Sequence, residues 1–195
     1  MFIAIQPAKK SSLSPRNAGR GQGEGPWQTM TIMLLDHRPT SRIITVMSEG
    51  RHTDYDDSYP TCVKTNSTLR IFSDALGPEE ITKVLNIEPT SAFRKGDVIG
   101  QGKLQRKTNG WFYCTEKLSN SKDTRCHLDM ILAALEGKLD AVKVLHARGC
   151  KTDISTHWMS VGQGGPWLMP EQMLKLGALD IGIWWDVYFA YEDET

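Results

Sequence analysis

The chain has 195 residues, 39% hydrophobic and 24% charged, with a formal net charge of zero. This is long enough for one domain with its own core, and the composition is that of an ordinary globular protein. No run of about 18 apolar residues is present, which excludes a typical membrane-spanning helix. The first ten residues lack the apolar core of a secretory signal. We therefore expect a cytoplasmic protein that makes no membrane contact.

Four scattered cysteines, Cys62, Cys114, Cys126 and Cys150, show no metal-binding spacing. Reduced thiols are the ordinary state of such residues in a cytosolic protein. We expect neither a metal nor a cofactor.

Residues 1–46 differ in composition from the rest. They contain six Lys and Arg against two acids, a net charge of +4, whereas the remainder carries −4. Much of this segment is rich in Gly, Ser, Pro and Arg without periodicity, and such a sequence buries too little apolar surface to offset the entropy of ordering. Its apolar pieces around Ile32 and Ile44 could form short strands, although Pro39 makes a continuous one improbable. We predict a low-complexity, disordered arm and native translation from Met47; the alternative is a basic arm that binds nucleic acid.

An acidic lead-in, residues 47–68, precedes the first regular pattern. The alternating segment LRIFSD predicts a strand from Leu69. The sequence Gly-Pro-Glu-Glu at 77–80 then predicts the start of a helix that runs to about Asn86. Residues 88–110 form a long predicted loop with short strand-like pieces at most, and the aromatic, alternating WFYCTEKL predicts the next strand.

The longest predicted element is an amphipathic helix that ends just before Gly149, a typical C-terminal cap. Gly137 lies in its middle and predicts a kink or a division into two helices. The apolar residues that recur at steps of three and four are Leu128, Ile131, Leu132, Leu135, Leu139, Val142 and Leu145.

The remaining elements are a strand over Lys151–Met159, a short helix near Pro170 and a final strand that ends at Phe189. The order is β-α-β-α-β-α-β. Because the strands alternate polar and apolar residues, we expect one face of the sheet to be exposed. We predict a single α+β domain over residues 69–190, a two-layer sandwich with a mixed or antiparallel sheet.

Several segments, taken in order, resemble one bacterial family. LRIFSDALGPEEITKVLNIEPTSAFRKGD, NGWFYCTE, ARGCKTDISTHW and GGPWLMPEQMLKLGALDIGIWWDVYF are together similar to domain-of-unknown-function family 4279, over roughly residues 59–189. The resemblance implies a fold class but no established activity. An acidic, tyrosine-containing lead-in such as DYDDSYPTC is common near the start of such proteins, which supports Met47 as the natural beginning.

The first candidate site centres on His157. Asp153, Ser155 and His157 share one face of the strand. A catalytic triad does not follow, because Asp153 and His157 lie roughly 13 Å apart at about 3.3 Å per residue. His157 could instead work with Ser155 or with Glu116 or Asp186 from a neighbouring strand; the alternative is a hydrogen-bonded histidine on a polar face.

The glycine-rich loop after this strand lacks the spacing of a phosphate-binding motif. We interpret Gly164 and Gly165 mainly as residues that allow a tight crossing from strand to helix. Both glycines, together with Trp158, remain binding candidates.

The second candidate is the basic loop 94–107, followed by Trp111. Its cations could hold an anion or an acidic partner, with Trp111 as an aromatic platform; a solvated basic loop is the alternative. Asp97 is the only acid among its cations Arg94, Lys95, Lys103, Arg106 and Lys107.

The third candidate is the final strand. Ile181, Ile183, Trp185, Val187 and Phe189 are expected to face the core. The opposite face then presents Trp184 and Tyr188 around Asp186, which would form an interaction surface unless helices cover it.

Three functions follow from these candidates. We favour a non-enzymatic binding module that recognises another protein. The alternative is a small enzyme or ligand sensor that acts on an anionic small molecule through His157, with Arg94 and Lys95 holding the anion. The third hypothesis, nucleic-acid binding through the basic loop, is disfavoured by the net acidity of the body. The enzyme hypothesis requires His157, Arg94 and Lys95 to meet in one pocket.

Overall fold

The structure is a computed structural model that describes residues 28–32, 44–48 and 54–190. It divides into two units, one up to Asp54 and one from Tyr55. In the first unit, β1 (Gln28–Ile32) pairs with β2 (Ile44–Ser48) as an antiparallel ladder in which Met30 lies opposite Val46. The rest of the predicted arm lies outside the described residues.

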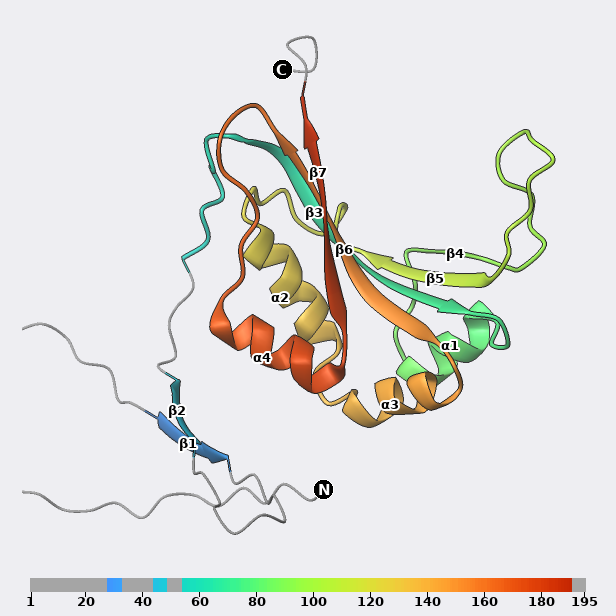
Figure 1. The fold of residues 1–195 in the computed structure, drawn as a ribbon, viewed down its shortest axis with the longest axis horizontal. Coiled ribbons are helices and arrows are strands. Elements are labelled where there is room, and N and C mark those ends of the chain that lie inside the picture. Colours follow the sequence, from blue (N-terminus) through green and yellow to red (C-terminus); the bar gives the residue numbers. More distant parts are fainter. Residues whose placement is uncertain (1–27, 33–43, 49–53, 191–195) are drawn as a thin grey trace, which may run out of the picture. The chain divides into compact units, whose positions relative to one another are not determined.

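The second unit is a five-stranded sheet with four helices on one face (Figure 1). The strand order is β4-β5-β3-β6-β7; every neighbouring pair is antiparallel except β6 and β7, which are parallel. The predicted α+β class and two-layer arrangement are therefore confirmed, with a mixed sheet. Its elements are β3 (Cys62–Ser73), α1 (Pro78–Leu85), β4 (Ser91–Phe93), β5 (Asn109–Cys114), α2 (Thr124–Ala134), α3 (Leu139–Ala147), β6 (Lys151–Ser160), α4 (Pro170–Leu179) and β7 (Gly182–Phe189).

The central strand β3 begins at Cys62, seven residues before the predicted start. The apolar pattern did not predict these first seven residues of β3, because two of their buried positions carry hydroxyl groups rather than apolar side chains. Ser67 bonds Thr156 of β6 through their hydroxyls at 2.9 Å, and Thr65 donates to the carbonyl of His157 at 2.7 Å. Buried hydroxyls that find partners in this way cost little, so a polar-looking segment forms the middle of the sheet.

The core lies between the sheet and the helices. Trp111 of β5 is buried there, and its indole N–H donates to the Thr82 hydroxyl of α1 at 3.0 Å. The predicted interruption at Gly137 is confirmed: α2 ends at Ala134, Gly137 adopts a φ of 70°, and α3 starts at Leu139. Two short helices can thus follow the twisted sheet better than one straight helix. The cluster also contains Leu69, Ile71, Ile81, Leu85, Leu128, Ile131, Leu145 and Ile154.

The C-terminal half of the final strand, β7, extends beyond the helix layer. Ile181 is buried and Ile183 packs against the core, but Trp185, Val187 and Phe189 are exposed. The expectation that this whole face is core is therefore wrong for its second half. Figure 1 shows the reason: the C-terminal half of β7 continues past α4 and α2, so none of the described helices lies against it.

Candidate functional site

No described segment covers the face of the sheet opposite the helices, as the alternating pattern predicted. We call it the open face. Along β3 and β6, residues that point to it are half-buried or exposed, whereas their neighbours are buried under the helices. It comprises Lys64, Asn66, Thr68, Arg70, Phe72, Ser91, Phe93, Phe112, Cys114, Asp153, Ser155, His157, Met159, Trp184, Asp186 and Tyr188.

One end of the open face gathers the predicted residues of β6 and β7. His157 lies in register between Asn66 of β3 and Asp186 of β7. Its ring packs against that of Tyr188, with 5.1 Å between centroids. Trp184 is 64% exposed and Tyr188 48%. We call this group the aromatic end; it places a carboxylate and an imidazole among exposed aromatic rings.

The opposite end carries three phenylalanines. Phe112 packs against Phe72 and Phe93 at 5.5 and 5.4 Å between centroids. The guanidinium of Arg106 lies 4.1 Å above the Phe93 ring, a cation–π contact. The Phe93 ring lies so close to Gly110 that a side chain there would collide with it. This end is therefore packed and occupied by its own side chains.

The middle of the open face is charged but internally paired. Arg70 bonds Asp153 at 2.6 Å, and both side chains are about a quarter exposed. Lys64 pairs with Glu116, and this hydrogen bond holds the pKa of the Glu116 carboxyl below its usual range. The Arg70–Asp153 pair separates the two ends of the face, whereas Lys64 lies opposite Met159, beside the aromatic end.

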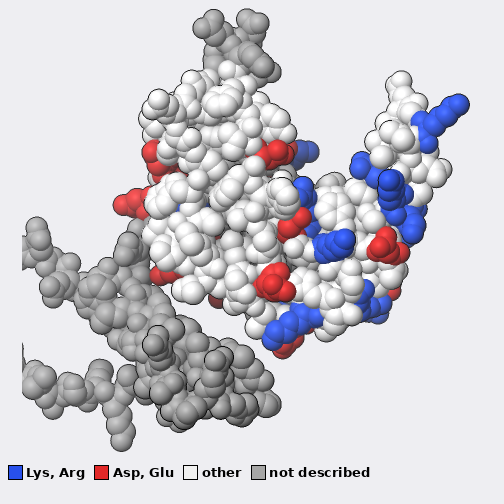
Figure 2. Space-filling view, viewed as in Figure 1, with Lys and Arg blue, Asp and Glu red and all other residues white. Residues whose placement is uncertain are grey.

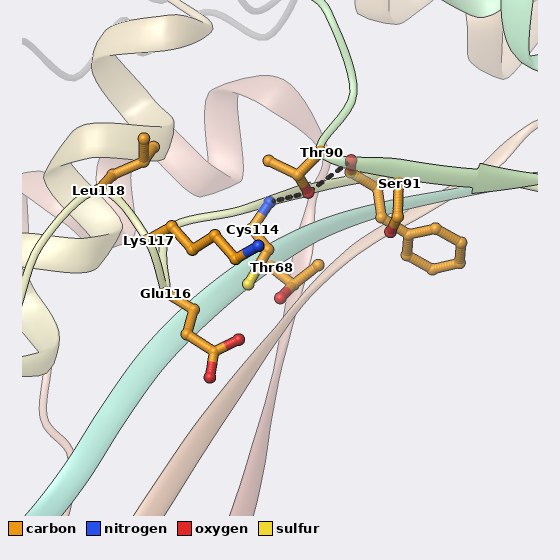
Figure 3. Close-up of a pocket in the computed structure, with 8 residues that line it drawn as sticks. Thr68, Thr90, Ser91, Cys114, Glu116, Lys117 and Leu118 are labelled. Carbon is orange, nitrogen blue, oxygen red and sulfur yellow. Dashed lines mark hydrogen bonds between the residues drawn. The ribbon is translucent and has the colours of Figure 1, made fainter.

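A shallow hollow of about 350 Å³ lies where β4 begins beside β5 (Figure 3). Thr90 fixes its rim: the hydroxyl donates to the carbonyl of Phe112 at 3.1 Å and accepts from the amide of Cys114 at 2.9 Å. Thr68, Glu116, Lys117 and Leu118 complete its lining. It does not contain His157, Arg94 or Lys95.

The structure does not bring Arg94 and Lys95 to His157. Both follow β4, at one edge of the sheet, whereas His157 is on β6, three strands away. That separation is roughly 14 Å across the strands, to which the register adds roughly 20 Å along them. Arg94 instead pairs with Glu79 of α1 at 2.5 Å. The pocket that the enzyme hypothesis requires is therefore not formed.

The basic loop is a folded extension of β4 and β5. Its strands are tied by a hydrogen bond from Gly96 to the carbonyl of Arg106 at 2.9 Å and by a bridge between Val98 and Gln105. Figure 2 shows Lys and Arg side chains concentrated on this extension. Part of its charge is already engaged, because Arg94 faces Glu79 and Arg106 covers Phe93.

Two tryptophans that the sequence singled out are not on the surface. Trp111 faces the helices, so the expected aromatic platform beside the basic loop is wrong. Trp158 is buried as well, on the helix side of β6, where Tyr59 packs edge-on at 5.2 Å. The sequence could not reveal this cover, because Tyr59 belongs to the acidic lead-in.

The glycine loop between β6 and α4 has a conformational role. Gly164 adopts a φ of 127°, and a Cβ there would lie 2.7 Å from the Tyr59 hydroxyl. Gly165 has open space around it. The predicted tight crossing is thus confirmed at Gly164.

A buried polar cluster at the start of α2 was missed by the sequence analysis. Asp123 accepts from the backbone amide of Arg125 at 2.9 Å, and its carboxylate also pairs with the Arg125 guanidinium. Burial opposes ionisation of Asp123, but hydrogen bonds from Arg125 and from the amide of Asp56 outweigh it and lower its pKa. The guanidinium also lies 4.2 Å from the Trp167 ring. The cluster joins α2 to the lead-in and to the glycine loop, and an Asp directly before a helix was its only sequence signal.

His127 extends this cluster. It is completely buried, its Nε2 donates to the carbonyl of Ser121 at 2.9 Å, and its Nδ1 lies 2.8 Å from the Thr115 hydroxyl. Burial lowers the pKa of the imidazole. The Thr115 hydroxyl donates to the Ser67 carbonyl at 3.0 Å, and its contact with Nδ1 connects α2 to the end of β5.

The Tyr55 hydroxyl donates a hydrogen bond to Asp129 of α2 at 2.9 Å, and burial together with this bond raises the pKa of Tyr55 to about 12.

Across the part of the chain that the structure describes, no group of three His, Cys, Asp or Glu side chains is placed to hold a metal ion. None of the described helices has both the length and the apolarity to cross a membrane.

Comparison with curated proteins and with solved structures finds no match. The model of one family, described as a domain of unknown function (DUF4279), matches residues 63–190. The match covers the whole five-stranded sheet apart from the first residue of β3. The chain therefore belongs to the DUF4279 family.

Proposed function

We propose that this protein is a non-enzymatic interaction module that binds a protein partner at the aromatic end of the open face. The observation that carries the proposal is the exposure of Trp184 and Tyr188 around Asp186. Tryptophan and tyrosine are the residues that most often anchor protein–protein interfaces. Exposed apolar groups clustered on a folded surface are typical of binding sites.

The alternative enzyme is less well supported, because its three key residues lie at separate places. His157 packs against Tyr188, while Arg94 bonds Glu79 on the opposite side of the sheet. Catalysis with an anion holder needs both groups within reach of one substrate. In the proposed module, His157 and Asp186 instead supply polar contacts beside the aromatic anchors.

The proposal places the module in the cytoplasm. Cys62, Cys114, Cys126 and Cys150 are free thiols in the structure, which suits a reducing compartment. Burial raises the pKa of the Cys62 thiol to about 11, so it stays protonated and unreactive.

The test uses the full chain, tagged and recovered from its native cells, with co-purified proteins and small molecules identified by mass spectrometry. We expect a stoichiometric protein partner that is retained by the unmodified chain and lost from Trp184→Ser. Arg94→Ala is the matched control, because it changes the opposite end of the sheet. A retained small molecule without a protein partner, lost on His157→Ala, would replace this proposal with the ligand-sensor alternative.

A further inference from the structure

We infer that the free edge of β7 pairs antiparallel with β7 of a second copy of this chain. β7 is the last strand of the sheet, and among the described residues only one of its edges is hydrogen-bonded, to β6. An edge strand exposes a row of unpaired backbone groups that can pair with another strand. The inference concerns this edge and is independent of the partner proposed for the open face.

The backbone geometry identifies which groups are available. The amide of Ala190 donates to the Ser160 carbonyl of β6 at 2.9 Å. Backbone groups of successive residues in a strand point alternately to the two edges. Even-numbered residues therefore face β6, and the N–H and C=O groups of Trp185, Val187 and Phe189 face outward.

The side chains of this half-strand are apolar and exposed on both faces of the sheet. Trp184 and Tyr188 lie on the open face, while Trp185 and Phe189, 37% and 72% exposed, lie on the other. At about 150–250 Å² per aromatic side chain, the exposed portions and the backbone edge supply on the order of 1,000 Å² across two copies, the lower limit of a specific interface. This predicts a dimer of moderate affinity.

Charge and exposure select the register. A two-fold axis at Asp186 would set two carboxylates opposite each other, which is destabilising. The run of exposed residues extends from Trp184 to Phe189, so Asp186 and Val187 are its two central positions, and the charge argument leaves Val187 as the axis. With the axis at Val187, Trp185 lies opposite Phe189 of the second copy, and Asp186 lies opposite Tyr188 of the second copy, whose phenol can donate to the carboxylate.

Edge pairing of this kind continues the sheet instead of stacking two sheets. The open faces of the two copies then lie side by side: pairing covers the sides of Trp184 and Tyr188 that face the strand edge and leaves the rest of each open face accessible. Their aromatic ends adjoin at the two-fold axis, so a partner would meet two copies of the proposed site.

The first test is sedimentation velocity of the full chain over a dilution series. We expect a reversible monomer–dimer equilibrium that Val187→Pro weakens by roughly tenfold or more, equivalent to about 1.4 kcal/mol or more. Proline at this position blocks an outward N–H and leaves the hydrogen bonds to β6 intact. Val187→Thr keeps the N–H and the branched shape, so it should dimerise like the unmodified chain. If Val187→Pro does not fold, Val187→Lys supplies the same test through charge at the edge.

The second test is disulfide trapping. At the axis, the two Val187 positions form a hydrogen-bonded pair about 5.5 Å apart between Cα atoms, within disulfide range. Val187→Cys should cross-link two copies on oxidation, whereas Phe189→Cys and the unmodified chain should not. Cross-linking through Phe189→Cys alone would overturn the register. A chain that stays monomeric at every concentration would overturn the dimer; if it still held its partner through Trp184, the proposed function would stand.

Discussion

Two ion pairs, one at the start of α2 and one on the open face, show how differently the two sides of this molecule are held together. Asp123 and Arg125 are almost completely buried, whereas Arg70 and Asp153 are about a quarter exposed. Both pairs have close contacts, but only the buried pair also contacts other segments: the amide of Asp56 bonds Asp123, and the Trp167 ring packs against Arg125. A close contact between charges thus says little about stability until the burial of both partners is known.

The sharpest test of this comparison removes the carboxylate from each pair. Asp123→Ala should lower the free energy of unfolding by about 3–5 kcal/mol, because it removes the carboxylate that pairs with the buried Arg125 guanidinium. Asp153→Ala should cost only about 0.2–1 kcal/mol, because solvent screens the pair. Urea denaturation of both variants measures the difference. Equal losses would contradict the distinction between the two sides.

A substitution at Gly110 tests whether every part of the open face tolerates an added side chain without loss of stability. Gly110→Ala should destabilise the fold by about 1–3 kcal/mol, because the added methyl group must displace the packed rings of Phe93 and Phe112. Gly165→Ala is the control: its surroundings are open, so a change within about 0.5 kcal/mol is expected. Thermal unfolding measures both. A neutral Gly110→Ala would mean that the phenylalanine end is as loose as the aromatic end.

His127 makes the helix-covered side sensitive to acid. Burial favours the neutral imidazole, so the pKa in the folded chain lies below the ordinary value of about 6.5 in the unfolded chain. The unfolded state therefore takes up a proton first as the pH falls. The stabilisation is fully present above pH about 6.5 and is lost as the pH falls from there toward the folded-state pKa.

Denaturation at a series of pH values between about 5 and 7.5 measures this dependence around the ordinary histidine pKa. His127→Gln should flatten the loss of stability over this range. His146→Gln, which replaces a half-buried histidine of α3, is the control for the substitution itself. An unchanged profile in His127→Gln would assign the acid sensitivity to other groups.

The smallest expected effect on stability is at the aromatic end. Trp184→Ser should change the free energy of unfolding by less than about 0.5 kcal/mol, because the side chain is mostly exposed. Comparison of its urea midpoint with that of the unmodified chain measures this. A loss comparable to that of Asp123→Ala would show that Trp184 serves the fold and would remove the main support for a binding role.

Local sequence signals predicted the helices: the start signal at 77–80 predicted α1, and apolar periodicity predicted the middle pair. The apolar steps around Leu128 and the glycine at 137 predicted α2, α3 and the break between them. The open face also followed from alternation along β6. Local pattern carries these features because each depends on one face of one element.

Packing between distant segments could not be predicted from the sequence. The hydroxyl-rich start of β3 and the burial of Trp158 by Tyr59 depend on contacts between distant segments. The exposure of Trp185 depends on where α4 ends in space relative to β7. For the candidate site, alternation grouped Trp184, Asp186 and Tyr188 on one face of the final strand, and the parallel register of β6 and β7 then places His157 beside Asp186.

The position of β3 also shapes how the chain reaches its fold. β3 is the first strand of the sheet to leave the ribosome, yet it lies at the centre and pairs with β5 and β6. Its register with β6 joins residues about 90 positions apart, such as Asn66 and His157. Contacts between such distant residues slow folding, because the intervening chain must be ordered first. β3 is therefore unpaired with β6 until β6 has been synthesised. Because the first half of β3 is polar, the unpaired strand does not expose a continuous apolar surface during that time.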